Sequence, residues 1–372
     1  SNTRARTGQG DMGLEVRGSM DGSEPGSVLE VMRQQWASMV SMGGMFVGTI
    51  LLGLSIQPVY DIDEVRAFGA EGASKGGYVA LELLFIMIFT VLIIWLARKG
   101  LDFVIKAIVM FALWFSLFYA VQPFSALLWW LIGLESINLV AGSTVVISTA
   151  LMLLLHLYPE WYVVNTVGIL VGAGVITLIG VSFVPVLIIA FMLAAAIYDH
   201  WAVNSSKHML ELADTMIKNK LPVLLVAPKE RGYSFIEEED RVMRREDSED
   251  MDWDDPAPNI KPKSGGREAL FMGLGDVIFP GMLVISSVSF LPEWGPEIST
   301  IWGIPMYAGP LAVGLGTLFG GLCGYVALMT QVARGEAQAG LPLLNGGSIL
   351  GYLVSGVIAI GPAALWQDIS FL

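Results

Sequence analysis

The 372-residue chain has few of the side chains that hold metals or form disulfides. It contains one cysteine, Cys323, and three histidines, at positions 156, 200 and 208. A disulfide within the chain and a zinc site built on cysteines are therefore excluded. Neither a His-Glu-x-x-His pair nor a Gly-x-x-x-x-Gly-Lys-Ser/Thr loop occurs, which argues against that class of zinc protease and against a P-loop ATPase. We expect neither a metal nor a cofactor.

Charge is also scarce, at 15 % of residues, where soluble domains carry about 25 %. Hydrophobic residues make up 54 %, and the mean hydropathy is +0.65. The net charge of −13 argues against a nucleic-acid partner, which would need a basic surface. The apolar residues occur in long uncharged runs, so the sequence predicts an all-α, multi-pass integral protein of the cell membrane, surrounded by the lipid bilayer.

Nine uncharged intervals are long enough for the roughly 20 apolar residues of a membrane-spanning helix. The predicted helices are about 37–58, 78–97, 101–121, 137–157, 161–180, 184–205 and 269–290, then one from Pro310 to near Arg334 and one from Pro342 to near Pro362. The third is expected to stop before Pro123. Residues 123–133, with two tryptophans, are expected to lie at the membrane interface.

These spans divide the chain into four regions. We expect a disordered tail at 1–35, transmembrane helices 1–6 at 36–206, a hydrophilic acidic loop at 207–268 and transmembrane helices 7–9 at 269–372. The acidic part of the loop, 237–255, holds eleven acids and three bases and is predicted to be solvated and disordered. With nine spans, 19 of the 21 Lys and Arg residues fall on the N-terminal side. The positive-inside rule then predicts a cytoplasmic N-terminus and an outer C-terminus.

Two aspartates within the spans are candidates for chemistry, because ionisable groups in a membrane are costly and usually functional. Asp199 precedes Lys207 by eight residues and Asp276 follows Arg267 by nine. At 1.5 Å per residue these offsets are about 12 and 13 Å, so both acids are expected at one depth on consecutive helices. Two carboxylates close together in a low dielectric share one proton, and such a pair can activate water. On position alone, aspartic proteolysis and ion coupling in a transporter both remain open.

The sequences around the acids are more specific. Tyr198-Asp199 in one span and Gly273-Leu274-Gly275-Asp276 in the next resemble the presenilin and signal-peptide-peptidase family, the GxGD-type intramembrane aspartyl proteases. The family's third signature is Pro-Ala-Leu at the start of the last helix. Here Leu341 and the following Pro342 match it, whereas Ala339 and Gly340 depart from it. The stretches 157–162, 207–209 and 340–347 are similar to archaeal members, so we expect an archaeal homologue.

The resemblance implies a role for each matching position. Asp199 and Asp276 are expected to be the catalytic pair. The residues expected to shape the site or bind substrate are Tyr198, Gly273, Leu274, Gly275, Gly340, Leu341 and Pro342. The implied activity is an endopeptidase that cuts within the transmembrane helices of single-span membrane proteins.

Three alternatives stay open at this point. One is a proton- or cation-coupled transporter that uses the same two aspartates, although transporters often contain internal repeats and we find none. The others are a prepilin-type leader peptidase and a non-catalytic membrane scaffold. Gly-x-x-x-Gly patterns at 168–172 and 316–324 predict helix packing inside the chain, with contacts in a homo-oligomer as the alternative.

Overall fold

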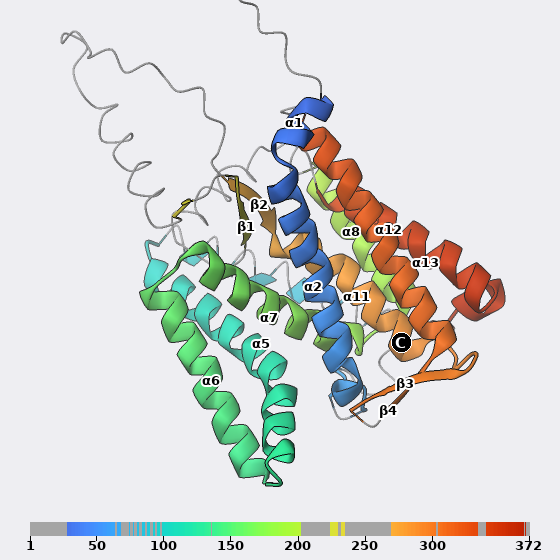
Figure 1. The fold of residues 1–372 in the computed structure, drawn as a ribbon, viewed down its shortest axis with the longest axis horizontal. Helices are drawn as coiled ribbons and strands as arrows, with labels where there is room; N and C mark the ends of the chain where they lie inside the picture. Colours follow the sequence, from blue (N-terminus) through green and yellow to red (C-terminus); the bar gives the residue numbers. More distant parts are fainter. Residues whose placement is uncertain are drawn as a thin grey trace, which may run out of the picture.

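The computed structural model is a bundle of apolar helices with a small antiparallel sheet at each end (Figure 1). The structure describes residues 28–63, 65–67, 99–134, 136–201, 224–229, 232–234, 269–302, 304–333, 340–367 and 369, with scattered residues between 74 and 96. The helices are α1 (Val28–Gln34), α2 (Trp36–Tyr60), α5 (Asp102–Leu131), α6 (Ile137–Leu157), α7 (Trp161–Gly180), α8 (Pro185–Trp201), α11 (Leu274–Phe290), α12 (Ala308–Val332) and α13 (Leu341–Ala359), followed by the short 3₁₀ helix η2 (Pro362–Leu365).

Among the described residues, six helices are long and apolar enough to cross a membrane: α2, α5, α6, α7, α12 and α13. The predicted spans 137–157 and 161–180 coincide with α6 and α7. The shorter apolar helices α8 and α11 fall on the sixth and seventh predicted spans. Half of the residues of the second predicted span, 78–97, lie outside the described residues, Glu82 among them. The count of nine therefore stays a prediction.

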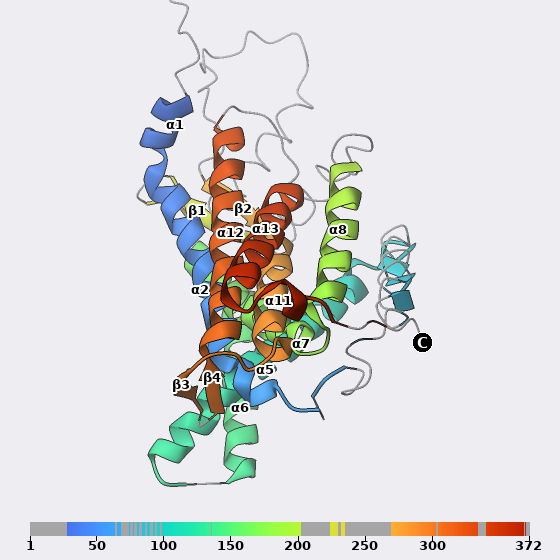
Figure 2. The same ribbon diagram turned by 90° about the vertical axis from the view of Figure 1, so that its right-hand side faces the viewer.

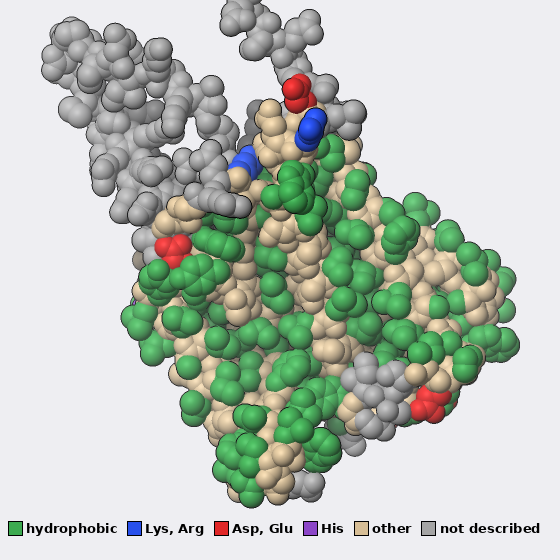
Figure 3. All heavy atoms as spheres, in the orientation of Figure 1, with side chains coloured by type: hydrophobic (Ala, Val, Ile, Leu, Met, Phe, Trp, Pro, Cys, Tyr) green, Lys and Arg blue, Asp and Glu red, His purple; other side chains and the backbone are tan. Residues whose placement is uncertain are grey.

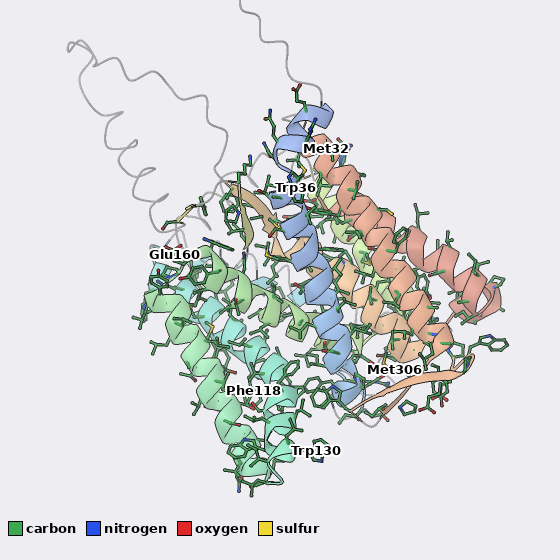
Figure 4. All side chains as sticks on the ribbon, in the orientation of Figure 1. Met32, Trp36, Phe118, Trp130, Glu160 and Met306 are labelled. Atoms are coloured by element: carbon green, nitrogen blue, oxygen red, sulfur yellow. The ribbon has the colours of Figure 1, made fainter. Side chains whose placement is uncertain are left out.

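The surface agrees with a membrane environment. In the face shown in Figure 3, hydrophobic side chains cover the helices and the few charged ones lie toward the ends. Figure 4 shows Trp36 near the end of α2 beside α1, and Trp130 at the opposite end of the bundle. Both tryptophans are exposed, at 62 % and 61 %. Tryptophans at both ends of a helix bundle are typical of the two membrane interfaces.

Helix α5 corrects one boundary. We predicted a helix that stops before Pro123 and an interfacial segment over 123–133, but α5 continues through Pro123 to Leu131. Proline is tolerated within membrane helices because neighbouring groups can satisfy the carbonyl that it leaves free. At 30 residues, α5 is about 45 Å long. It is therefore longer than the bilayer core, which is about 30 Å thick.

The start of the seventh span needs a second correction. It was predicted at residue 269, but Ala269–Gly273 form the strand β2 and α11 begins only at Leu274. An apolar run of this length does not distinguish a buried strand from a helix. Asp276 therefore lies in the first turn of a helix rather than a third of the way along it.

Two predicted irregular regions contain regular structure. The last part of the predicted tail, 1–35, is the helix α1, and residues 1–27 lie outside the described part. The predicted loop, 207–268, contains the strand β1 (Leu224–Pro228). The acidic segment 237–255 lies outside the described residues.

The β1 and β2 strands pair antiparallel, with Val226 opposite Phe271. Ser38, near the start of α2, donates a hydrogen bond from its hydroxyl to the Pro228 carbonyl at 2.6 Å. The sheet thus lies at the end of the bundle where α2 and α7 begin (Figures 1 and 2). A second hairpin, β3 (Glu297–Ile301) and β4 (Ile304–Tyr307), lies at the opposite end, where the indole of Trp302 donates to the Ser55 carbonyl at 2.6 Å.

Helix α7 is the centre of the bundle and contacts α2, α5, α6, α11 and β1. Its glycines permit this. A Cβ on Gly172 would lie 2.8 Å from Thr49 of α2 and 3.1 Å from Leu274 of α11. The predicted 168–172 pattern is therefore an internal packing face.

Helices α12 and α13 form a second close seam through glycines on both sides. A Cβ on Gly320 would fall on the Gly347 carbonyl oxygen and lie 2.8 Å from the Gly351 Cα. Gly324 packs in the same way against the backbone of Leu343 and Leu344. Small residues let helix backbones approach closely in membranes, so this predicted glycine pattern also packs inside the chain.

Substituting Gly320 with alanine tests this seam. Because the added methyl group meets backbone atoms that cannot rotate away, we expect Gly320→Ala to lower the free energy of unfolding by about 1–3 kcal/mol. Thermal unfolding of the purified protein in detergent would show it as a lower midpoint. The matched control is Gly48→Ala, since a Cβ on Gly48 meets nothing within 4 Å. Equal midpoints for the two variants would contradict the close seam.

Candidate active site

Asp199 lies near the end of α8 and is buried, with 4 % of its surface exposed. The backbone N–H of Leu341, the first residue of α13, donates to the Oδ2 atom of Asp199 at 3.3 Å. The first N–H groups of a helix have no partner within the helix, and the helix dipole favours a negative group there. The start of α13 is therefore suited to hold the carboxylate of Asp199.

Asp276 occupies the first turn of α11 and is partly buried. Gly273 is extended and precedes the helix, and its backbone forms a hydrogen bond with the Asp276 carboxylate. An acid in the first turn is also favoured by the helix dipole. Each acid thus lies at the N-terminus of a helix, Asp199 at that of α13 and Asp276 at that of α11.

Gly340 brings the two acids to one place. A Cβ on Gly340 would lie 3.1 Å from Oδ2 and 3.3 Å from Oδ1 of Asp276. Gly340 is the neighbour of Leu341, which binds Asp199. The two carboxylates therefore lie around the same pair of residues, close enough to act on each other electrostatically. Helices α8, α11 and α13 contact one another, as Figure 2 shows from the side.

A carboxylate pair in such surroundings has a defined chemistry. Two carboxyl groups that lie close together away from bulk water disfavour ionisation of both, so such a pair can hold one shared proton. The protonated carboxyl group can polarise a carbonyl and the ionised one can take a proton from water. His200 lies within electrostatic range of Asp199, and His208 falls outside the described residues.

The remaining predicted site residues have different surroundings. Leu274 is buried and packs on Gly172 of α7, so it fixes the start of α11. Gly275 is exposed, and a Cβ there would meet nothing within 4 Å. Tyr198 is 62 % exposed. Pro342 lies in the first turn of α13.

Of the four residues at the predicted third signature, Gly340, Leu341 and Pro342 are described, and Ala339 lies outside the described part. The first two lie against the acids, as the structure places them. Their role in binding or shaping stays a prediction.

Two asparagines that join elements of the bundle were given no role by the sequence analysis. The Asn345 amide donates to the Met192 carbonyl at 3.0 Å and ties α13 to α8. Asn165 of α7 bonds to both backbone groups of Val226 in β1. An uncharged amide lacks the charge that marks an ionisable group within an apolar run. The apolar stretch 221–228 within an otherwise hydrophilic loop was the available signal for β1.

The sequence and the fold both match those of known proteins. A sequence model described as signal-peptide peptidase, presenilin aspartyl protease matches residues 39–361. A search of curated proteins gave no match. Two solved structures, each described as a presenilin family intramembrane aspartate protease, match the fold.

The first, in space group C222, has a TM-score of 0.55 and 26 % identity over 87 % of this chain and 99 % of its own. The second, in space group P2, has a TM-score of 0.54 and 27 % identity over 86 % of this chain and 97 % of its own. The family match covers most of the chain, and the fold agrees with it. The chain is a multi-pass integral membrane protein and belongs to the signal-peptide peptidase and presenilin family of intramembrane aspartyl proteases.

Proposed function

We propose that this protein is an intramembrane aspartyl endopeptidase in which Asp199 and Asp276 activate the water that cleaves a peptide bond within a substrate's transmembrane helix. The proposal rests on one observation: the Asp276 carboxylate lies against Gly340, and the Asp199 carboxylate accepts a hydrogen bond from the adjacent residue, Leu341. An ion-coupling role for the same pair is the competing function, and family membership favours the protease.

The reaction needs only the two acids and water. The protonated acid donates a hydrogen bond to the scissile carbonyl oxygen, and the ionised acid removes a proton from water as it attacks the carbonyl carbon. Collapse of the tetrahedral intermediate then transfers a proton to the leaving nitrogen and restores the shared proton. The pair titrates as one coupled unit.

The substrate is a single transmembrane helix that unwinds locally near the acids. Unwinding is required because a helix keeps its carbonyls in its own hydrogen bonds. We propose that the unwound segment is held by strand pairing, either near β2, which runs directly into α11, or at 340–342. The open space beside Gly275 supports this, because a neighbouring backbone can approach there without meeting a side chain.

The orientation of the substrate follows from the orientation of the enzyme. With nine spans and a cytoplasmic N-terminus, the acids lie toward the cytoplasmic side. By resemblance to presenilin, which has this topology, the preferred substrate has its N-terminus outside.

Removing either acid tests the catalytic assignment. We expect Asp199→Ala and Asp276→Ala each to reduce cleavage of a single-span reporter by at least about 100-fold, because each removes a general acid–base group. The assay uses purified protein in detergent, with an aspartic-protease transition-state mimic as an inhibited sample.

Asp63→Asn is the control, since Asp63 is a largely exposed carboxylate that pairs with Arg66 away from the site. If the alanine variants still cut the reporter at the wild-type rate, Asp199 and Asp276 are not the catalytic pair. Loss of ion flux by the same mutants, in a protein that cuts nothing, would point to the transporter instead.

Substitutions of Gly340 test how large a side chain the site accepts beside Asp276. A Cβ there lies just inside ordinary contact distance of Asp276, whose carboxyl group can shift by a few tenths of an ångström. We expect Gly340→Ala to keep cleavage within about threefold of wild type, and Gly340→Val to lose at least about tenfold, because misplacing a catalytic group is costly.

The matched control is Gly346→Val on the same helix, where a Cβ meets nothing within 4 Å. kcat/KM and the thermal midpoint are measured for each variant. The expectation is wrong if Gly340→Val and Gly346→Val have equal activity.

A further inference from the structure

Asn165 is a buried amide of α7 that faces the strand β1. It is 5 % exposed. Its Nδ2 atom donates to the Val226 carbonyl at 2.7 Å, and its Oδ1 atom accepts from the Val226 N–H at 2.8 Å. A residue of a neighbouring antiparallel strand exchanges the same two bonds with its partner. The carboxamide of Asn165 therefore takes the place of a third strand.

This contact closes one edge of β1 at its centre. In an antiparallel pair, a residue directs its N–H and C=O to the same side, and the next residue directs them to the other side. Both groups of Val226 point to Asn165, so the ladder to β2 is made by its neighbours, Leu225 and Ala227. No other strand can pair with Val226 while Asn165 is in place.

The sheet depends on such anchoring. A two-stranded sheet is marginally stable by itself. The three central residues of β1, Leu225 to Ala227, are at most 1 % exposed, and Ser38 of α2 holds the end of the strand at Pro228. The strand is thus fixed to α2 and α7 by contacts within the chain.

The anchored strand leads directly to one of the acids. β1 pairs along its whole length with β2, from Leu224 opposite Gly273 to Pro228 opposite Ala269. Gly273 directly precedes α11, and its backbone forms a hydrogen bond with the Asp276 carboxylate. A chain of contacts therefore runs from Asn165 through the sheet to the start of the helix that carries Asp276.

We propose that Asn165 is a positioning residue of this protease: its carboxamide keeps β1 folded and so presents β2 in a fixed place before a substrate arrives. The proposal rests on the proposed function. A substrate that meets a folded sheet does not have to order it, so Asn165 lowers KM and leaves kcat almost unchanged.

Enzyme kinetics in lipid nanodiscs test the role. Asn165→Ala is expected to raise KM for a single-span reporter by roughly tenfold, the effect of two lost hydrogen bonds, with kcat within about twofold. Thr166→Ala is the matched control, because Thr166 is the next residue and its exposed side chain bonds only within α7. A fall in kcat at unchanged KM would overturn the proposal.

The variant Asn165→Asp separates hydrogen bonding from packing. A protonated aspartic acid has one donor and one acceptor, like the amide, whereas the ionised form has acceptors only. We expect the ratio of its KM to that of the wild type to be near one at acidic pH and to rise toward the value of Asn165→Ala as the pH increases. A ratio that does not change with pH would count against the proposal. This variant also decides the question if Asn165→Ala does not fold.

Amide hydrogen exchange gives a readout that needs no activity. Peptides covering 224–228 are expected to exchange roughly tenfold faster in Asn165→Ala than in wild type, with no change in Thr166→Ala. Unchanged exchange would show that β1 does not depend on Asn165 and would overturn the proposal. If wild-type protein cuts no reporter, the proposed function fails, and the exchange result still supports or rejects the anchor.

Discussion

The start of α13 is the point that the candidate site depends on. A charged group in the membrane interior is costly unless it meets partners, and here the backbone supplies one: the free N–H of Leu341 donates to Asp199. Asp276 lies at another helix start and approaches α13 at Gly340, where there is no side chain to keep it away. The start of α13 therefore stabilises Asp199 and leaves room for Asp276. The contacts with Leu341 and Gly340 are made by the backbone and not by a Lys or Arg side chain, and a permanent positive charge in their place would favour ionisation of both acids.

The position of that helix end is fixed by packing at two levels. The glycine seam with α12 sets the distance of α13 from the bundle, since Gly320 and Gly347 leave room only for backbone against backbone. The amide of Asn345 then sets its rotation and height against α8 by bonding to Met192. Dispersion contacts along the seam tolerate small shifts of one helix against the other, whereas a hydrogen bond requires a particular distance and angle. The glycines thus permit the approach, and the amide defines it.

The sequence predicted the helices best where charges mark both ends of an apolar run. Glu135 and Glu160 bracket α6, whose predicted bounds match the structure. For α7, Glu160 marks the start and the break at Gly180, Ser182 and Pro185 marks the end, and these bounds match as well. The prediction was wrong at Pro123, because the breaker rule for soluble helices does not hold in a membrane. It also missed β1 and β2, which are five residues long each and pair residues 41 to 49 apart in the sequence. The aspartates could be found because charge in an apolar span is conspicuous, but the residues that place them are neutral.

The neutral polar side chains in the bundle fall into two kinds. Most hydroxyls bond to a carbonyl of their own helix, as Thr49 does to Met45 and Thr317 does to Val313. Such bonds satisfy the hydroxyl group but do not fix the position of a neighbouring helix.

The two asparagines are of the other kind, because an amide has more donors and acceptors than one helix turn can satisfy. Asn345 reaches α8 seven residues before Asp199, and Asn165 reaches the strand whose partner precedes Asp276. Asn345 thus fixes the helix whose start meets both acids, and Asn165 fixes the strand whose partner precedes one of them. Charged residues could make equally directed contacts, but their fields would bias the ionisation of the carboxyl groups, whereas an amide carries no net charge and adds no such field.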